Sequence, residues 1–193
     1  MNGILKKGDS VRRFEDERLL RGQGQFVDNR DLQGQVFLHF LRSIYGHARI
    51  RGIQTEEARV MPGVIGIFTG EDLIRDGVQP VPVTMPFIRE DGSAAASAPY
   101  YPLATDAARF MGQAVAMVVA ETPQQALEAA ECIEVDYEEL PVLTSMKEAA
   151  EPGAPKLWEE ISDNIAAAKS LGDEQAVDEC FKKAKHVSRL ELV

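Results

Sequence analysis

The three histidines are the first residues to test for chemistry, because imidazole serves as a general acid or base and as a metal ligand. His39, His47 and His186 are far apart, and none lies at metal-ligand spacing from a carboxylate or a cysteine. His39 falls in an apolar segment, which favours a hydrogen-bonded core residue over a ligand. His47 follows a turn at Tyr45–Gly46, so packing within that turn is favoured over a position facing a partner or a substrate path.

Carboxylates and hydroxyls are the next candidates for catalysis. Four acidic residues lie close together, namely Glu134, Asp136, Glu138 and Glu139. They could form an acid/base or cation site, but their alternation with apolar residues places some of them on the solvated face of a strand instead. Ser93 and Ser97 have no glycine elbow and no nearby base, which argues against a hydrolase triad.

Basic and aromatic residues could recognise a partner or a ligand. Seven arginines in the N-terminal part of the chain could meet an acidic partner, although most are expected to be solvated: Arg12, Arg13, Arg18, Arg21, Arg42, Arg49 and Arg51. Tyr100 and Tyr101 could stack on a ligand, but in a proline-rich segment they are expected to pin the loop to the body. The Gly-x-Gly within Arg21–Gln25 lacks a third glycine and a preceding buried strand, so it predicts a turn rather than a phosphate loop. The residues alone therefore predict no catalytic, cofactor-binding or metal-binding site.

Composition narrows the class of protein. The 193 residues carry a formal net charge of −10, which argues against nucleic-acid binding because phosphate neutralisation needs Lys and Arg. The two cysteines, Cys132 and Cys180, form no ligand pair and fit free thiols of a cytosolic protein. No apolar run is long enough for a signal peptide or a membrane span, so we expect a cytoplasmic protein.

The elements that must position these residues are organised around residues 109–141. The apolar, valine-rich run Ala114–Ala120 predicts a strand that is buried on both faces. Thr122 and Pro123 then predict the capped start of a helix, whose apolar face includes Ala126, Ala130 and Ile133. The alternating stretch Ile133–Tyr137 predicts a second strand with one solvated face. This strand–helix–strand unit is the expected core.

Further elements are predicted on either side of this unit. Strands are expected at Val36–Ile44, with both faces largely buried, and at His47–Ile53, Val64–Phe68 and His186–Val193. Helices are expected at 12–20 (anchored by Phe14, Leu19 and Leu20), Thr55–Arg59, Thr69–Gly77, Ser145–Ala150 and Asp173–Lys185. Residues 78–102 are rich in proline and predict a long surface loop, and residues 1–10 predict a loose lead-in. A turn at Glu151–Pro155 precedes Leu157–Trp158, which is expected to cover an edge of the core.

The C-terminal part of the sequence carries an amphipathic pattern. The predicted helix places five apolar side chains on one face: Ala176, Val177, Cys180, Phe181 and Ala184. The strand predicted at His186–Val193 follows this helix, and its alternation of apolar and polar residues still continues at the last residue, Val193. We therefore expect the native polypeptide, or a partner chain, to continue the structure.

Several short blocks, in order, resemble one protein family. They are Asp16–Asp28, Leu41–Ile50, Met61–Val64, Phe68–Leu73, Gly112–Ala116, Val135–Pro141 and Gly172–Asp173. The chain is similar to the N-terminal region of the large subunit of molybdenum hydroxylases, the xanthine dehydrogenase and aldehyde oxidase family, especially the carbon monoxide dehydrogenase type. The blocks extend over nearly the whole chain.

The resemblance implies an α/β (α+β) fold, the α/β-hammerhead, with a mixed sheet and short crossing helices over a single domain at 1–193. In the family, a longer molybdenum-binding region follows this domain and supplies the pterin contacts and the catalytic glutamate. That region has no counterpart in this chain. Other subunits or domains bring FAD and two 2Fe–2S clusters. The resemblance gives no role to His47 or Arg49, which lie in one of the matching blocks.

The leading hypothesis is a hammerhead domain that packs beside the catalytic region and helps to shape the path to the active site, without being catalytic itself. The parent complex would use molybdopterin, FAD and 2Fe–2S clusters and would hydroxylate a small molecule. The alternative is a free-standing adaptor that binds a protein and does no redox chemistry. A reading frame that continues past Val193 would favour the first hypothesis.

Overall fold

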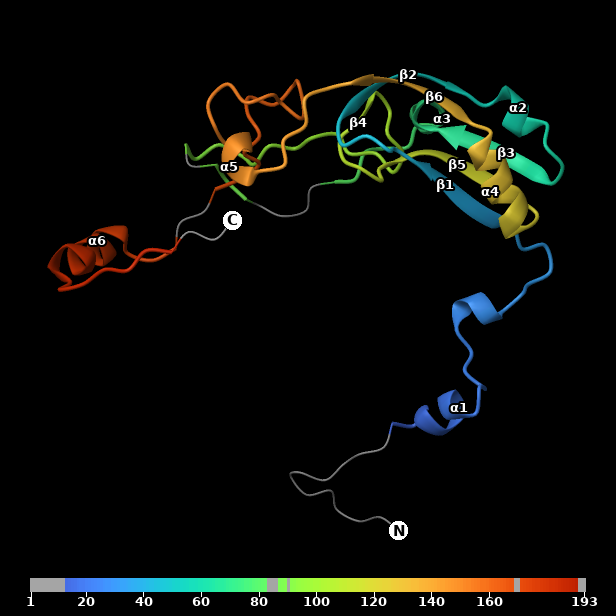
Figure 1. Cartoon of the computed structure of the whole chain (residues 1–193), viewed down its shortest axis with the longest axis horizontal. Helices are drawn as coiled ribbons and strands as arrows, with labels where there is room; N and C mark the ends of the chain where they lie inside the picture. The colour runs from blue at the N-terminus through green and yellow to red at the C-terminus, as the bar shows by residue number, and fades with distance from the viewer. Residues whose placement is uncertain (1–12, 83–86, 90, 169–170, 191–193) are drawn as a thin grey trace, which may run out of the picture.

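The computed structural model describes residues 13–82, 87–89, 91–168 and 171–190. Two small sheets form the body of the molecule (Figure 1). The first sheet has the order β1-β5-β3, with β1 at Phe37–Arg42, β5 at Ala114–Ala120 and β3 at Val64–Thr69. The second has the order β4-β2-β6, with β4 at Ala107–Ala108, β2 at Ala48–Gln54 and β6 at Glu134–Glu139.

The expected α/β class is confirmed, and the strands form two three-stranded antiparallel sheets where a mixed sheet was expected. Strands β5 and β6 of the predicted strand–helix–strand unit therefore lie in different sheets. The reason is that β1 and β3 already occupy both edges of β5. No edge is left for β6, which pairs with β2 along its length.

Six short α-helices and one 3-10 turn accompany the sheets in the described residues. They are α1 at Asp16–Leu20, α2 at Glu56–Arg59, α3 at Gly70–Arg75, α4 at Pro123–Glu131, α5 at Met146–Ala149, α6 at Glu174–Lys183 and the 3-10 turn at Val27–Asn29. The predicted start of α4 is confirmed, because the Thr122 hydroxyl accepts the Gln125 N–H at 3.2 Å. Thr55, in contrast, does not cap α2, because its hydroxyl accepts a hydrogen bond from Arg59 Nε instead.

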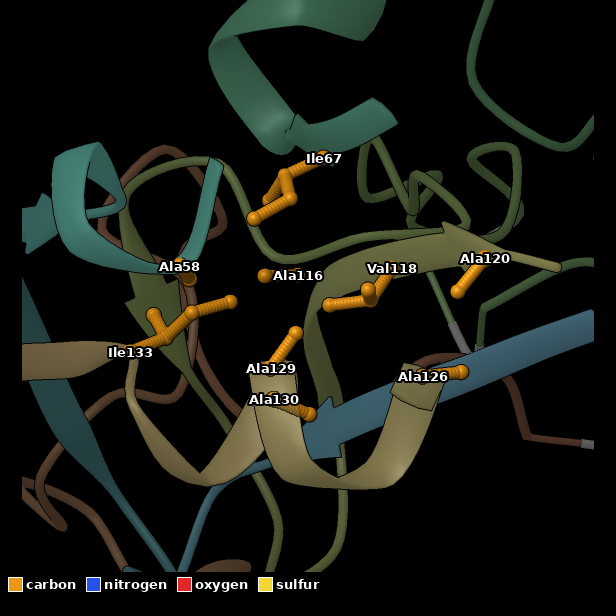
Figure 2. Packing of buried hydrophobic residues seen from close by; sticks show 9 residues of the cluster. All are labelled: Ala58, Ile67, Ala116, Val118, Ala120, Ala126, Ala129, Ala130 and Ile133. Carbon is orange, nitrogen blue, oxygen red and sulfur yellow. The ribbon is translucent and has the colours of Figure 1, made fainter. Parts of the chain in front are cut away.

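The hydrophobic core lies between α4 and the first sheet (Figure 2). Its fully or nearly buried members are Ala58, Ile67, Ala116, Val118, Ala120, Ala126, Ala129, Ala130 and Ile133. Alanines on the inner side of α4 let the helix approach the strands closely. Strand β5 is the most buried strand of the sheet, as its apolar run predicts.

Strand β1 is less buried than its sequence predicts. Both faces were expected to be largely buried, but Leu38 is 48% exposed and the inner residues Phe37 and His39 are only half-buried. The strand lies at an edge of the first sheet, and α4 covers one face only. A pattern that is apolar on both sides therefore indicates a second contact that the described residues do not supply.

Two predictions about the ends of the chain are wrong. Helix α1 forms, but Phe14, Leu19 and Leu20 do not anchor it, since they are 105%, 43% and 87% exposed. Residues 186–190 form no strand, because no neighbouring strand pairs with them there, and residues 191–193 lie outside the described ranges. Figure 1 shows α1 and α6 standing apart from the sheets at opposite ends of the body.

In its described residues (78–82, 87–89 and 91–102), the predicted loop at 78–102 is irregular apart from one bridge between Ile88 and Ala94. The Val81 N–H donates to the Tyr100 carbonyl oxygen at 2.8 Å, which links the two ends of the loop to each other. The predicted turn after α5 is present, with Gly153 in the left-handed region at φ 85°.

Candidate functional site

The structure keeps the three histidines apart. His39 is half-buried in β1 opposite Val118, and His186 lies exposed with Nε2 at 3.0 Å from Ser188 Oγ. His47 is 9% exposed, and its Nδ1 lies 3.0 Å from the Pro141 carbonyl oxygen. His47 therefore ties the start of β2 to the segment after β6, which agrees with the packing role favoured by the sequence.

The acidic residues of β6 are solvated: Glu134, Asp136 and Glu138 share one face of the strand, and Glu139 points to the other. Glu134, Asp136, Glu138 and Glu139 are all exposed. Glu138 pairs with Arg51 and, at 3.5 Å, with Arg49, whose Nη2 also reaches Glu159 at 3.2 Å. Surface ion pairs of this kind contribute little stability and do not constitute a catalytic pair.

The serines and the early arginines likewise show no catalytic arrangement. Ser93 donates its hydroxyl to Asp91 at 2.6 Å in a local turn. Arg18 and Arg21 pair with glutamates one turn away within the α1 segment, and Arg42 donates to the Gly112 carbonyl at 2.8 Å. Gly22 has φ 70° and ends α1, so the predicted turn at Arg21–Gln25 is confirmed.

Sequence reasoning missed the most elaborate polar cluster, which surrounds Arg109. The guanidinium donates to both carboxylate oxygens of Asp106 at 2.7 and 2.9 Å and to the Leu157 carbonyl at 3.1 Å. Its Cζ lies 3.5 Å from the centre of the Trp158 ring. Asp106 and Arg109 are close in sequence, but no local pattern could show that a tryptophan 49 positions later would stack on Arg109.

The charge of Asp106 depends on this contact. Burial disfavours the charged carboxylate, but hydrogen bonds and positive charge from Arg109 outweigh it and hold the pKa of Asp106 below its ordinary value. A carboxylate with a lowered folded-state pKa adds stability above its unfolded pKa. That contribution is lost as pH falls through the folded pKa.

Substituting Arg109 by methionine is therefore expected to loosen the 155–165 segment and to destabilise the chain by about 2 kcal/mol at neutral pH. The difference from wild type should shrink as the pH falls from the ordinary aspartate pKa of about 3.9 through the lower folded-state pKa of Asp106. Urea unfolding at several pH values, followed by Trp158 fluorescence, measures both effects. The matched control is Arg75→Met, because Arg75 is 69% exposed and its loss should be nearly neutral. An equal effect of both substitutions would contradict the assignment.

A cavity of about 160 Å³ lies beside Arg109. Its lining mixes both signs of charge, with Arg49 and Lys156 against Glu159 and Glu160. Such a lining selects neither an anion nor a cation. Within the described ranges, no group of three or more His, Cys, Asp or Glu side chains is placed to hold a metal ion.

The exposed apolar surface of the two-sheet body says more about function than its polar clusters and its cavity do. Five side chains project from the side of the first sheet that faces away from α4, and we call them the outer sheet face: Leu38, Phe40, Phe68, Met117 and Val119. The strand register places them together, because Leu38 pairs with Val119 while Phe40 and Phe68 both pair with Met117. Leu38 and Phe68 are 48% and 36% exposed, and the other three are half-buried.

This face is unusual for a two-layer antiparallel arrangement, in which the side away from the helices normally carries polar residues. Contiguous apolar patches on a protein surface mark contact sites. The geometry of the described residues therefore favours packing against another body over chemistry within this chain. Cys132 and Cys180 are both free and exposed, and no helix in the described part has the length and apolar content to cross a membrane.

Comparison with known proteins gives a consistent result. Residues 21–141 match the family model described as aldehyde oxidase and xanthine dehydrogenase, a/b hammerhead domain. The chain is 37% identical to the carbon monoxide dehydrogenase large chain of Afipia carboxidovorans, over 94% of this chain and 23% of that protein. It is 34% identical to the nicotine 6-hydroxylase large subunit of Paenarthrobacter nicotinovorans, over 93% of this chain and 21% of that subunit.

Solved structures show the same likeness. The reconstituted CO dehydrogenase from Oligotropha carboxidovorans superimposes with a TM-score of 0.78 at 34% identity, over 93% of this chain and 22% of that one. Quinoline 2-oxidoreductase from Pseudomonas putida 86 gives 0.72 at 34% identity, over 83% of this chain and 20% of that one. The chain thus spans between a fifth and a quarter of the length of these relatives.

Proposed function

Because the chain belongs to the aldehyde oxidase and xanthine dehydrogenase family through its a/b hammerhead domain, we propose that it is a packing domain of a molybdenum hydroxylase large subunit and is not catalytic by itself. In this role it lies beside the molybdenum-binding region and helps to shape the path by which a substrate reaches the active site. The molybdenum-binding region is either part of the same polypeptide or a separate chain.

The observation that carries this proposal is the outer sheet face. Its five side chains carry no charge, whereas transient interfaces are about as polar as ordinary protein surface. Permanent interfaces are more apolar and resemble a domain core divided in two. A partly exposed apolar sheet face thus supports lasting contact with a second body rather than intermittent recognition.

The residues of this chain do not fit the iron–sulfur clusters of the proposed parent complex. A 2Fe–2S cluster is held by four cysteines in most proteins, and this chain has two, on different elements. Molybdopterin, FAD and the 2Fe–2S clusters would accordingly be bound by other regions or subunits. The parent reaction would be the oxidative hydroxylation of an aldehyde, a heteroaromatic carbon or a related small molecule, with water as the oxygen source.

The composition of the native complex tests this proposal. The complex would be purified from its source with an antibody against this domain, and its subunit masses and its molybdenum, iron and flavin contents would be measured. We expect the domain to copurify in stoichiometric ratio with molybdenum, within one long chain or a tight assembly. A lone chain of 21.2 kDa without metal would contradict the proposal and favour a free-standing adaptor that binds a protein partner.

A further inference from the structure

Helix α6 presents an apolar stripe that nothing in the described structure covers. The stripe consists of Ala176, Val177, Cys180, Phe181 and Ala184, which recur at helical spacing. Val177 is 51% exposed and Phe181 is 58% exposed, and the helix has no buried residue. Figure 1 shows α6 beyond α5, well away from both sheets.

Local interactions alone do not account for this helix. It has ten residues, fewer than the roughly 12–15 at which isolated helices become marginally stable in water. The Asp173 side chain caps it by accepting the Ala176 N–H at 2.9 Å, and Glu179 pairs with Lys182 and Lys183. One cap and two surface ion pairs contribute only a small part of the stability that a helix needs, so burial of the stripe must supply the remainder.

A second copy of the chain is a poor occupant for the stripe. A helix of this length is about 15 Å long and 10 Å across, which gives a footprint on the order of 150 Å². Two such faces would bury about 300 Å², whereas stable interfaces between separate proteins bury about 1,200–2,000 Å². A face this small can remain bound to a partner surface only when that surface is present at high effective concentration. This condition is met within one polypeptide or one permanent assembly.

The relatives indicate which partner meets that condition. The alignment with the CO dehydrogenase chain covers 93% of this chain, so 7% of 193 residues, about 14, remain outside it. The described segment 171–190 is longer than that, so at least part of it has an equivalent in that relative. There the equivalent belongs to a polypeptide more than four times as long, since the alignment spans 22% of that chain.

We infer that the apolar stripe of α6 docks onto an apolar surface of the molybdenum-binding region of the large subunit, with Phe181 as its central anchor. This inference rests on the proposed function and names the contact by which the C-terminal part of the domain is held. Helix α6 would then reach its full stability only in the assembled enzyme, where it is in contact with the molybdenum-binding region.

The two free cysteines provide a direct test. Cys180 lies on the stripe, whereas Cys132 lies at the end of α4 on the body, and both are exposed in the described chain. Both thiols of the isolated 193-residue chain should react readily with a maleimide. In the intact complex purified from its source, Cys180 should react about 100-fold more slowly, because labelling would require local opening of the interface. Peptide mass spectrometry reports each site separately.

The outcomes separate this inference from the proposed function. A purified complex that contains molybdenum, in which Cys180 still reacts at the rate of the isolated chain, would overturn the docking of α6 alone. Failure to recover any molybdenum with the domain would instead remove the proposed function.

If both Cys132 and Cys180 react slowly with the maleimide in the complex, a pair of variants shows whether the stripe of α6 is responsible. Phe181→Glu places a charge in the stripe, whereas Glu179→Gln changes the polar side of the same helix. Only Phe181→Glu should restore fast labelling of Cys180 in the complex. Equal protection in both variants would overturn the inference.

Discussion

Replacing Val118 by aspartate is expected to unfold the two-sheet body. Val118 is fully buried in the middle of β5, where it faces α4 and belongs to the core cluster (Figure 2). A carboxylate at this position would lose its hydration without gaining a partner, and the site would lose packing at the same time. We expect a loss of more than about 4 kcal/mol, which exceeds the margin of many small domains. Circular dichroism and urea unfolding of the isolated chain measure it.

The neighbouring position offers a matched control. Val119 is adjacent in sequence but belongs to the outer sheet face, so Val119→Asp places the same side chain on the opposite side of the same strand. The isolated chain should tolerate it at a cost of about 1 kcal/mol, within the range that strand propensity accounts for. Equal destabilisation by the two substitutions would show that both sides of β5 are core in the isolated chain.

The local elements of this fold were predictable because their signals are local. Valine-rich Ala114–Ala120 and the Thr122–Pro123 start of α4 each follow from residues within one element, and both are confirmed. The pairing of strands was not predictable in this way. Whether β6 joins β5 or β2 depends on β1 and β3, which come from distant parts of the sequence and occupy both edges of β5.

The errors at the ends of the chain have one physical cause. Apolar residues such as Phe14 and Leu20 predict burial, but a sequence pattern does not say whether the covering surface belongs to the same domain. The same holds for the strand expected at His186–Val193, which finds no neighbour in the described structure. The contact between Arg109 and Trp158 was missed for a different reason, since a stack between distant residues leaves no periodic signal.

In the native complex, Val119→Asp is expected to have an effect as large as that of Val118→Asp in the isolated chain, but on assembly instead of folding. A charge in the centre of the outer sheet face would be buried without a partner when the face is covered, which costs several kcal/mol at an interface. The matched control is Val60→Asp. Val60 lies at the end of α2, outside the outer sheet face, is 83% exposed and should accept the charge without effect.

The molybdenum content of the complex, measured per copy of this domain for wild type, Val119→Asp and Val60→Asp, tests the packing role most directly. We expect stoichiometric molybdenum with wild type and with Val60→Asp, and a loss of most of it with Val119→Asp although that domain remains folded. Full molybdenum content and normal subunit ratios in the Val119→Asp complex would contradict the assignment of the outer sheet face as the surface that holds this domain in the enzyme.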